Sequence, residues 1–91
     1  MAERWRVFGL VRAVHEWETR FRPGDEEVLA LYEWCFRCME DGPPGAPEGA
    51  VRSAIDPEEL YSYRVPGAQA LASYWVVTQD RTFILRSIVS A

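Results

Sequence analysis

The sequence contains no lysine: apart from a single histidine, its ten basic residues are all arginine. Contacts to phosphate must therefore come from arginine, and a general base must come from another type of side chain. Two cysteines and one histidine are also too few for a structural zinc site, which takes about four such ligands. We expect no metal and no cofactor.

Long hydrophobic runs are absent as well. No stretch approaches the ~20 apolar residues that span a bilayer. The apolar run nearest the N-terminus is FGLV, and Arg4, Arg6 and Arg12 interrupt the apolar pattern around it. Arginines in such positions do not fit an ordinary signal peptide. We therefore expect a cytoplasmic protein that does not insert into membranes.

Apolar and aromatic residues, in contrast, are plentiful. Hydrophobic residues make up 48% of the 91 residues, and Trp, Tyr and Phe contribute four each. A chain of this composition can bury enough apolar surface to fold, so disorder is not expected. The length suits one small domain, and we predict that residues 1–91 form it.

Charge is distributed unevenly along the chain. The net charge is −4, but residues 25–60 hold ten of the 14 acidic residues and only two of the ten arginines. Residues 1–24 and 61–91 are mildly basic. Phosphate neutralisation dominates sequence-indifferent binding to nucleic acids, so the net charge argues against that activity. The two ends can still combine into a local basic surface.

The first half of the chain predicts a strand followed by two helices. WRVFGL (5–10) has a strand pattern, and the helical stripe after it consists of Leu10, Val14, Trp17 and Phe21. Pro23-Gly24 breaks the chain, and Asp25 is a suitable N-cap for a second helix that ends at the Gly- and Pro-rich loop 42–49. The residues expected on the inner side of the second helix are Val28, Leu29, Tyr32, Cys35, Phe36 and Met39.

The second half predicts strands. LYSYRV (60–65), AQALASYWVVT (68–78) and TFILRSIV (82–89) are rich in aromatic and β-branched residues. Pro66-Gly67 fits the centre of a type II turn and Asp80-Arg81 fits a second tight turn. Residues 50–58 carry little pattern, and Asp56-Pro57-Glu58-Glu59 is the one stretch that indicates the start of a helical turn. The prediction is a small α+β domain, in which an N-terminal strand and two helices pack on an antiparallel β-meander.

Two-residue turns would place Val65 opposite Ala68 and Trp75 opposite Arg86. Side chains alternate across a sheet, and cross-strand partners share a face. The core face then carries Tyr61, Tyr63, Val65, Ala70, Ala72, Tyr74, Val76, Phe83 and Leu85. The other face carries Ser62, Arg64, Gln69, Leu71, Ser73, Trp75, Ile84 and Arg86.

Arg64 and Arg86, with Trp75 between them on that second face, are the strongest candidate site. Two guanidiniums on one sheet face can hold a phosphate through bidentate hydrogen bonds. An indole beside them can stack on a base or on a guanidinium. The alternatives are a solvated sheet face and a surface that a partner protein covers.

Three further features have both a functional and a purely structural explanation. CFRC (35–38) lies inside a periodic helix, whereas redox cysteine pairs work at a helix N-terminus, so we predict two packed thiols without a metal. His15 lies off the apolar stripe and is either a general acid or a solvated helix residue. Glu58 is either a base on the face of Arg64 or an acid at a helix start.

The order of elements, together with several stretches, resembles the RelE/ParE superfamily of bacterial type II toxins. The stretches are HEWETRF, the second helix running into GPPGAP, YSYRVPG and SYWVVTQDRTFILRSI. The superfamily often has a helix that ends in a Gly-Pro loop, a strand with a Tyr-Arg-Val core, and two closing strands around an Asp turn. The resemblance covers most of the chain and implies a small α+β domain with a functional sheet face.

In RelE-like members that face binds messenger RNA in the ribosomal A site. The ribose 2′-hydroxyl attacks the adjacent phosphate, and arginines stabilise the developing charge. The resemblance thus implies a ribosome-dependent mRNA endonuclease in which Arg64 and Arg86 are catalytic, and Trp75 and Arg81 bind the substrate. Arg64 matches the arginine of the Tyr-Arg-Val strand, and Arg86 matches the basic residue of the last strand. The partner implied is a cognate antitoxin.

A non-enzymatic function is the alternative. ParE-like members inhibit DNA gyrase without a catalytic site, and a relative that has lost its chemistry can serve as a protein-binding module. The absence of lysine, and an end RSIVSA without Tyr or His, favour this alternative. The two arginines on one face favour mRNA cleavage.

Overall fold

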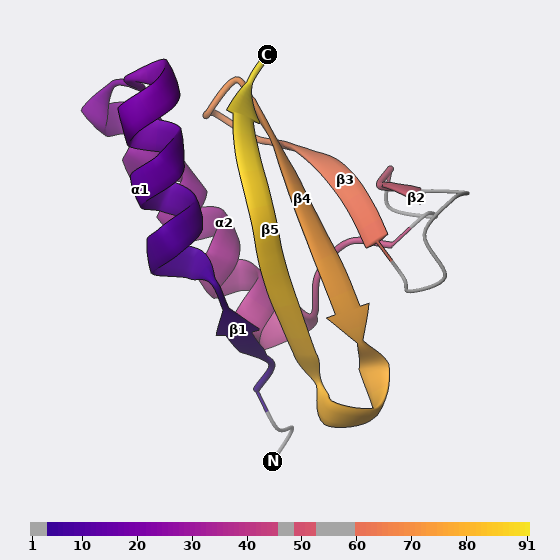
Figure 1. The fold of residues 1–91 in the computed structure, drawn as a ribbon. Coiled ribbons are helices and arrows are strands. Elements are labelled where there is room, and N and C mark those ends of the chain that lie inside the picture. Colours follow the sequence, from indigo (N-terminus) through magenta and orange to yellow (C-terminus); the bar gives the residue numbers. More distant parts are fainter. Residues whose placement is uncertain (1–3, 46–48, 53–59) are drawn as a thin grey trace.

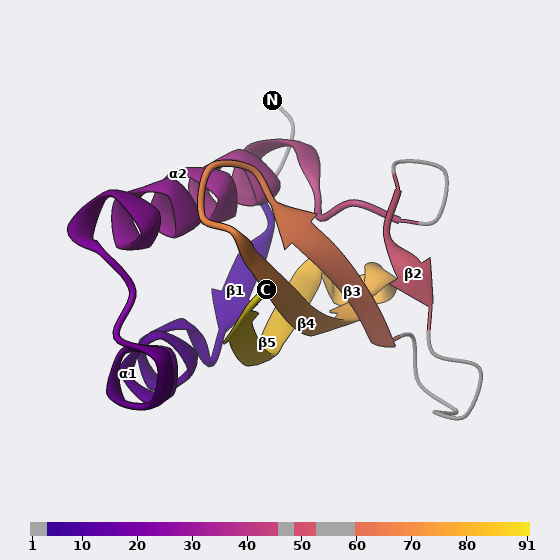
Figure 2. The same ribbon diagram turned by 90° about the horizontal axis from the view of Figure 1, so that it is seen from above.

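The computed structural model describes residues 4–45, 49–52 and 60–91. Two helices cover one face of a five-stranded sheet, so the predicted small α+β architecture is confirmed (Figures 1 and 2). The elements in chain order are β1 (Arg6–Phe8), α1 (Leu10–Phe21), α2 (Asp25–Asp41), β2 (Val51–Arg52), β3 (Leu60–Val65), β4 (Ala70–Val77) and β5 (Thr82–Ser90). The strand order is β1-β5-β4-β3-β2. β1 is parallel to β5, and the other neighbours are antiparallel.

Helix α1 packs on the sheet through the predicted stripe. Val14 and Trp17 are buried, and the Trp17 indole N–H donates to Ser90 Oγ at 3.0 Å. The stripe fails only in the last turn, where Phe21 is 41% exposed. Gly9, just before the helix, has φ 77°, and a Cβ there would lie 2.6 Å from the carbonyl oxygen of Leu85. A glycine at this position therefore lets the helix start directly against β5.

The N-cap of helix α2 lies one residue earlier in the sequence than predicted. The N-cap is Gly24, whose N–H donates to the Glu27 carboxylate at 3.3 Å, and Asp25 is the first helical residue. Three acidic residues occupy the first turn, where the helix dipole favours negative charge.

The predicted buried face of α2 is partly wrong. Leu29 and Phe36 are 59% and 58% exposed. The residues of α2 that are buried are Leu31, Trp34, Cys35 and Cys38. This set follows the i, i+3, i+4, i+7 spacing of one helix face, and it buries the large indole of Trp34. The helix has apolar residues on more than one side, and packing selected the side that carries the indole.

The two turns of the meander are longer than predicted. Pro66-Gly67 does form the centre of a type II turn, since Gly67 has φ 81° and the Ala68 N–H donates to the Val65 carbonyl at 3.3 Å. Gln69 then adopts φ 47°, so that Val65 pairs with Ala70 instead of Ala68.

The β4–β5 turn is also longer than predicted, and the pairing of the two strands is shifted by two residues. A 3₁₀ turn (Thr78–Asp80) followed by Arg81 at φ 47° brings Val77 opposite Thr82. Trp75 therefore pairs with Ile84, and the predicted pairing with Arg86 is wrong. A shift of two residues keeps every side chain on its face because the sheet has period two. The predicted assignment of the strand residues to the two faces is confirmed.

A β-bulge interrupts the β4–β5 ladder beside Arg86. Ser73 pairs with Ser87, but the next residue, Tyr74, pairs with Leu85, so Arg86 is the extra residue of β5. The bulge shifts the alternation of β5 by one position. Ile88 consequently turns toward the helices and is only 3% exposed.

The edge of the sheet beyond β3 was not predicted. Val51 and Arg52 form β2 and pair with Ser62 and Tyr61. The helical turn predicted at 56–59 lies outside the described residues. Among those that are described, no helix is long and apolar enough to cross a membrane.

Tyr74 is the aromatic centre of the core. It is 0% exposed and contacts the rings of Trp34, Tyr61 and Phe83 at centroid distances of 5.8 to 6.3 Å. Its hydroxyl donates to the carbonyl oxygen of Pro44. This bond satisfies a buried polar group and ties the loop after α2 to the middle of the sheet.

Candidate functional site: the outer sheet face

The sheet face opposite the helices is not covered by any described helix, and we call it the outer sheet face. Cross-strand pairing and alternation place on it Arg6 and Phe8 of β1, Val51 of β2, Leu60, Ser62 and Arg64 of β3, Leu71, Ser73, Trp75 and Val77 of β4, and Thr82, Ile84, Arg86, Ser87 and Val89 of β5. All four site residues predicted from the sequence lie on this face or at its margin.

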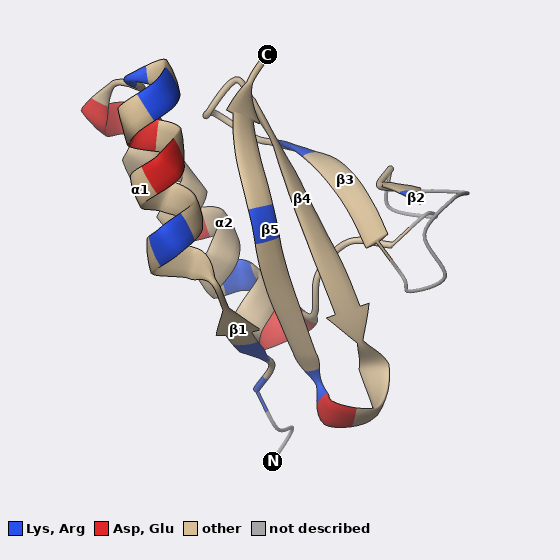
Figure 3. Cartoon of the chain, in the orientation of Figure 1, with Lys and Arg blue, Asp and Glu red and all other residues tan. Residues whose placement is uncertain are grey.

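Charge is segregated between the two layers of the fold. No aspartate or glutamate occurs in the described strands, whereas α2 alone carries six. Figure 3 shows the acidic residues on the helices and in the β4–β5 turn, with only arginine on the strands. Arg6, Arg64 and Arg86 are all exposed on the outer sheet face. The face is therefore basic although the chain has a net charge of −4.

The outer sheet face also exposes apolar and aromatic side chains. Phe8 is 55% exposed, and Leu71, Trp75 and Ile84 are half-buried. Val77 and Val89 are 37% and 38% exposed at its ends. Exposed apolar and aromatic side chains among polar groups are typical of a binding site.

Arg86 and Trp75 contact one another on this face. The guanidinium carbon of Arg86 lies 5.9 Å from the centroid of the Trp75 ring, within the range of a cation–π interaction. Trp75 pairs with Ile84, so Arg86 is its diagonal neighbour across the β4–β5 ladder. The contact holds the guanidinium over the middle of the sheet.

Arg64 approaches the same region from β3. It pairs with Leu71, and its exposed side chain forms no hydrogen bond or ion pair with the described residues. Strand β4 separates it from Arg86, which places the two Cα atoms roughly 12 Å apart. The hydroxyls of Ser62 and Ser73 lie on the same face, 3.0 Å from each other. The two long side chains can thus converge on one anionic ligand above β4.

Arg81 lies at the far end of the face. Its carbonyl oxygen accepts a hydrogen bond from the Arg6 N–H at 2.8 Å, in the turn before β5. Arg86 is five positions further along the chain, a distance of about 17 Å along a strand. The structure brings Arg86 onto Trp75, places Arg64 on the same face but opposite Leu71, and leaves Arg81 beside Arg6.

Arg6 is a residue that the sequence prediction missed. Its strand β1 pairs in parallel with β5, so Arg6 lies opposite Thr82 and Phe8 lies opposite Ile84. The alternation of Arg6, Val7 and Phe8 in the sequence indicates that Arg6 and Phe8 share one face of a strand. It does not indicate which strand β1 pairs with, so it could not place Arg6 on the face of Arg86.

The cysteine pair is buried in α2, as predicted. Cys35 and Cys38 are free thiols that are 0% and 3% exposed. Burial raises the pKa of each to about 12, and for Cys38 the neighbouring Cys35 adds to the rise. Both thiols are therefore protonated at neutral pH and unreactive as nucleophiles. Across the described ranges, no cluster of three His, Cys, Asp or Glu side chains could hold a metal ion.

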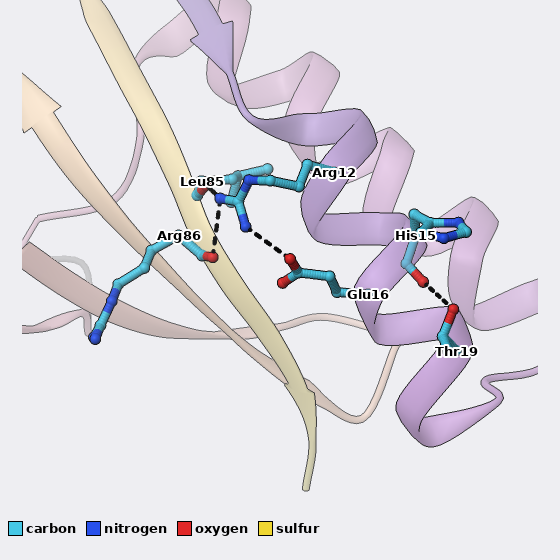
Figure 4. A network of polar contacts seen from close by, with 6 residues as sticks. All are labelled: Arg12, His15, Glu16, Thr19, Leu85 and Arg86. Carbon is cyan, nitrogen blue, oxygen red and sulfur yellow. Dashed lines mark hydrogen bonds and ion pairs between the residues drawn. The ribbon is translucent and has the colours of Figure 1, made fainter.

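His15 does not join the arginines. It is exposed on α1, on the other side of β5 from the Arg86 side chain (Figure 4). Glu58 lies outside the described residues. On the described part of the outer sheet face, the polar side chains are arginine, serine and threonine, and neither a carboxylate nor an imidazole is present.

No protein-family model, curated protein or solved structure matches the chain. The chemistry of the outer sheet face is therefore the guide to function. Guanidinium donors favour phosphate, the indole favours a stacked base, and the apolar surround favours a ligand that is larger than a single ion.

Proposed function

We propose that the chain is the toxin of a type II toxin–antitoxin pair, with a RelE/ParE-like fold, and that its outer sheet face binds messenger RNA on the ribosome in the cytoplasm. The observation that carries the proposal is the segregation of charge. Three exposed arginines and an indole share a face whose described residues include no carboxylate, while the acidic residues that the structure describes lie on the helices and in a turn. The order strand, helix, helix, meander supports the resemblance.

In this proposal the arginines act on the scissile phosphate. The ribose 2′-hydroxyl attacks the adjacent phosphate, the bond from phosphorus to the 5′-oxygen breaks, and the hydroxyl proton ends on that leaving oxygen, which leaves a 2′,3′-cyclic phosphate. Negative charge builds on the phosphate oxygens during this step, and Arg64 and Arg86 stabilise it through charge-assisted hydrogen bonds. Trp75 stacks on a neighbouring base. Arg64 has no other bond to the described residues, so it is free to turn toward the phosphate.

A second candidate is supported by the lack of an acid–base group on the described part of the face. Cleavage needs a proton acceptor for the 2′-hydroxyl, whereas binding does not. Under this alternative the same face binds a protein, as in a ParE-like gyrase inhibitor or a module without catalytic activity. Phe8, Leu71 and Ile84 would then contribute the apolar contacts.

The proposed protein partner is a cognate antitoxin. A segment of an antitoxin that orders on binding would bury the exposed apolar part of the outer sheet face. The arginines on the same face favour acidic residues in such a segment.

A cleavage assay on programmed ribosomes tests the proposal. Purified chain is mixed with 70S ribosomes carrying a defined mRNA, and the products are mapped. Arg64→Ala should lower the cleavage rate by about 100-fold, whereas Arg20→Ala, at an exposed position of α1, should leave it unchanged. If the parent cleaves nothing but inhibits gyrase supercoiling, the binding alternative replaces the nuclease.

A further inference from the structure

Arg12, in the first turns of α1, bonds to the backbone of β5 beside Arg86. Its Nη2 donates to the carbonyl oxygens of Leu85 at 3.2 Å and Arg86 at 3.3 Å. Its Nη1 donates to the Glu16 carboxylate at 3.2 Å. Figure 4 shows Arg12 on the helix side of β5 and the Arg86 side chain leaving the strand on the opposite side.

The two carbonyl groups that Arg12 contacts belong to consecutive residues, Leu85 and Arg86. In a regular strand, successive carbonyls point toward opposite edges, so one group cannot bond to both of them. At the bulge, where Leu85 pairs with Tyr74 and Ser87 pairs with Ser73, this alternation is broken. Arg12 therefore bonds to the bulged conformation of β5 and not to a regular one.

The position of Arg12 follows from the end of β1. The β1–β5 ladder stops at the pair Phe8–Ile84, so no described strand pairs with the edge carbonyls of β5 beyond that pair. The chain turns at Gly9 against the Leu85 oxygen and starts α1 there. Arg12 is thereby placed to donate to the carbonyls that β1 leaves open.

We propose that Arg12 is a positioning residue for Arg86. By bonding to both carbonyls, it fixes the backbone of the bulge at Arg86 and so sets the direction in which the Arg86 side chain leaves the strand, over Trp75. The planar guanidinium suits this role because its nitrogens donate in fixed directions to several oxygens at once. Glu16 holds the second nitrogen of Arg12 and so orients the fork. The consequence for RNA rests on the proposed function, whereas the consequence for the Arg86 side chain does not.

A measurement on the Arg86 side chain tests the positioning directly. In the parent, we expect the indole ring current to shift the Arg86 side-chain NMR signals upfield, and Trp75→Leu supplies the reference without a ring. In Arg12→Met we expect these signals to move to the reference values, and in the control Arg20→Met to stay. Arg12→Lys, which keeps the charge without the fork, should give an intermediate shift. Parent-like signals in a folded Arg12→Met or Arg12→Lys protein would overturn the proposal.

A double-mutant cycle on RNA binding tests the consequence for function. With a single-stranded RNA oligonucleotide as probe, Arg12→Met should weaken binding roughly 3- to 10-fold. Adding Arg12→Met to Arg86→Ala should cause no further loss, because Arg12 acts through Arg86. If the losses of RNA affinity caused by the two single substitutions add up in the double variant, Arg12 does not act through Arg86. If the parent binds no RNA, the proposed function fails, and the NMR signals alone still decide the role of Arg12.

Discussion

Arg86 lies over Trp75, with its guanidinium carbon 5.9 Å from the ring centroid, on the sheet face away from the helices. At an exposed site such a contact contributes about 0.5–1 kcal/mol, too little to account for the stability of the fold. Its effect is to restrict a long side chain to one region of the face. A binding site gains from this because less side-chain entropy is lost when the ligand arrives.

Arg64→Ala is expected to abolish growth arrest on induced expression while the fold stays intact. An exposed arginine on a sheet face changes the free energy of unfolding by about 0.5 kcal/mol or less, whereas a lost transition-state contact costs ~3 kcal/mol. Arg86→Ala should have a weaker effect. Growth curves and thermal melts of the purified variants measure both quantities.

Tyr63→Ala is the control for unfolding, since Tyr63 stacks on Trp34 at 5.9 Å within the core. It should lose activity together with about 3 kcal/mol of stability. If the parent arrests growth and Arg64→Ala arrests it equally well, Arg64 is only a solvated residue.

The outer sheet face should make the isolated chain prone to self-association. Phe8 and Trp75 leave apolar surface in contact with water, and an antitoxin would cover it. We expect a concentration-dependent mass in light scattering, and a melting temperature that rises when the product of a neighbouring antitoxin gene is added. A strictly monomeric chain that its neighbour's product does not stabilise would contradict the proposal.

The buried thiol of Cys35 predicts a loss of stability at alkaline pH. Burial raises its pKa from 9.0 to about 12, so the folded state keeps the thiol neutral where the unfolded state ionises. The contribution to stability is complete below pH 9 and is lost as pH rises from 9 toward 12. Urea unfolding at pH 8 and pH 10.5 measures the decline.

Cys35→Ala supplies the comparison for that decline. The variant should be less stable than the parent at pH 8 because of the cavity it creates, but it should lose less stability between the two pH values. An equal loss in both proteins would assign the decline to other groups, such as the tyrosines.

Gly9→Ala should destabilise the fold by more than about 1 kcal/mol. The residue has φ 77°, and a Cβ would lie 2.6 Å from the Leu85 oxygen, so both the backbone and the neighbouring strand oppose a side chain. Gly24→Ala is a matched control: its φ is −71° and the nearest atom to a Cβ is 3.9 Å away. Chemical denaturation should show a clearly smaller loss for Gly24→Ala.

Sequence patterns sufficed for both helices, for β1, β3, β4 and β5, and for the faces of the strands. Val65 and Trp75 were each paired with a partner two residues away from the observed one, and the faces survived because an even shift conserves the alternation. The extra residue at Arg86 could not be foreseen, since a bulge depends on the packing of Ile88 and on Arg12 from a distant helix.

The inner side of α2 shows the same limit. Leu29 and Phe36 repeat at a helical spacing, as do Leu31 and Cys38, and periodicity alone does not rank the two stripes. The choice was made by Trp34, which stacks on Tyr63 and meets Tyr74 across the core. Likewise, Arg6 joined the candidate site only because β1 pairs in parallel with β5.

That parallel pairing has a consequence for how the protein is made. Arg12 and the Leu85 carbonyl that it bonds to are 73 residues apart in the sequence, and α1 has no other strand to pack on so extensively. At about 5–20 residues per second, the first helix leaves the ribosome several seconds before β5 exists. The outer sheet face therefore assembles only after β5 has emerged, so a partially synthesised chain that lacks β5 has no complete outer sheet face.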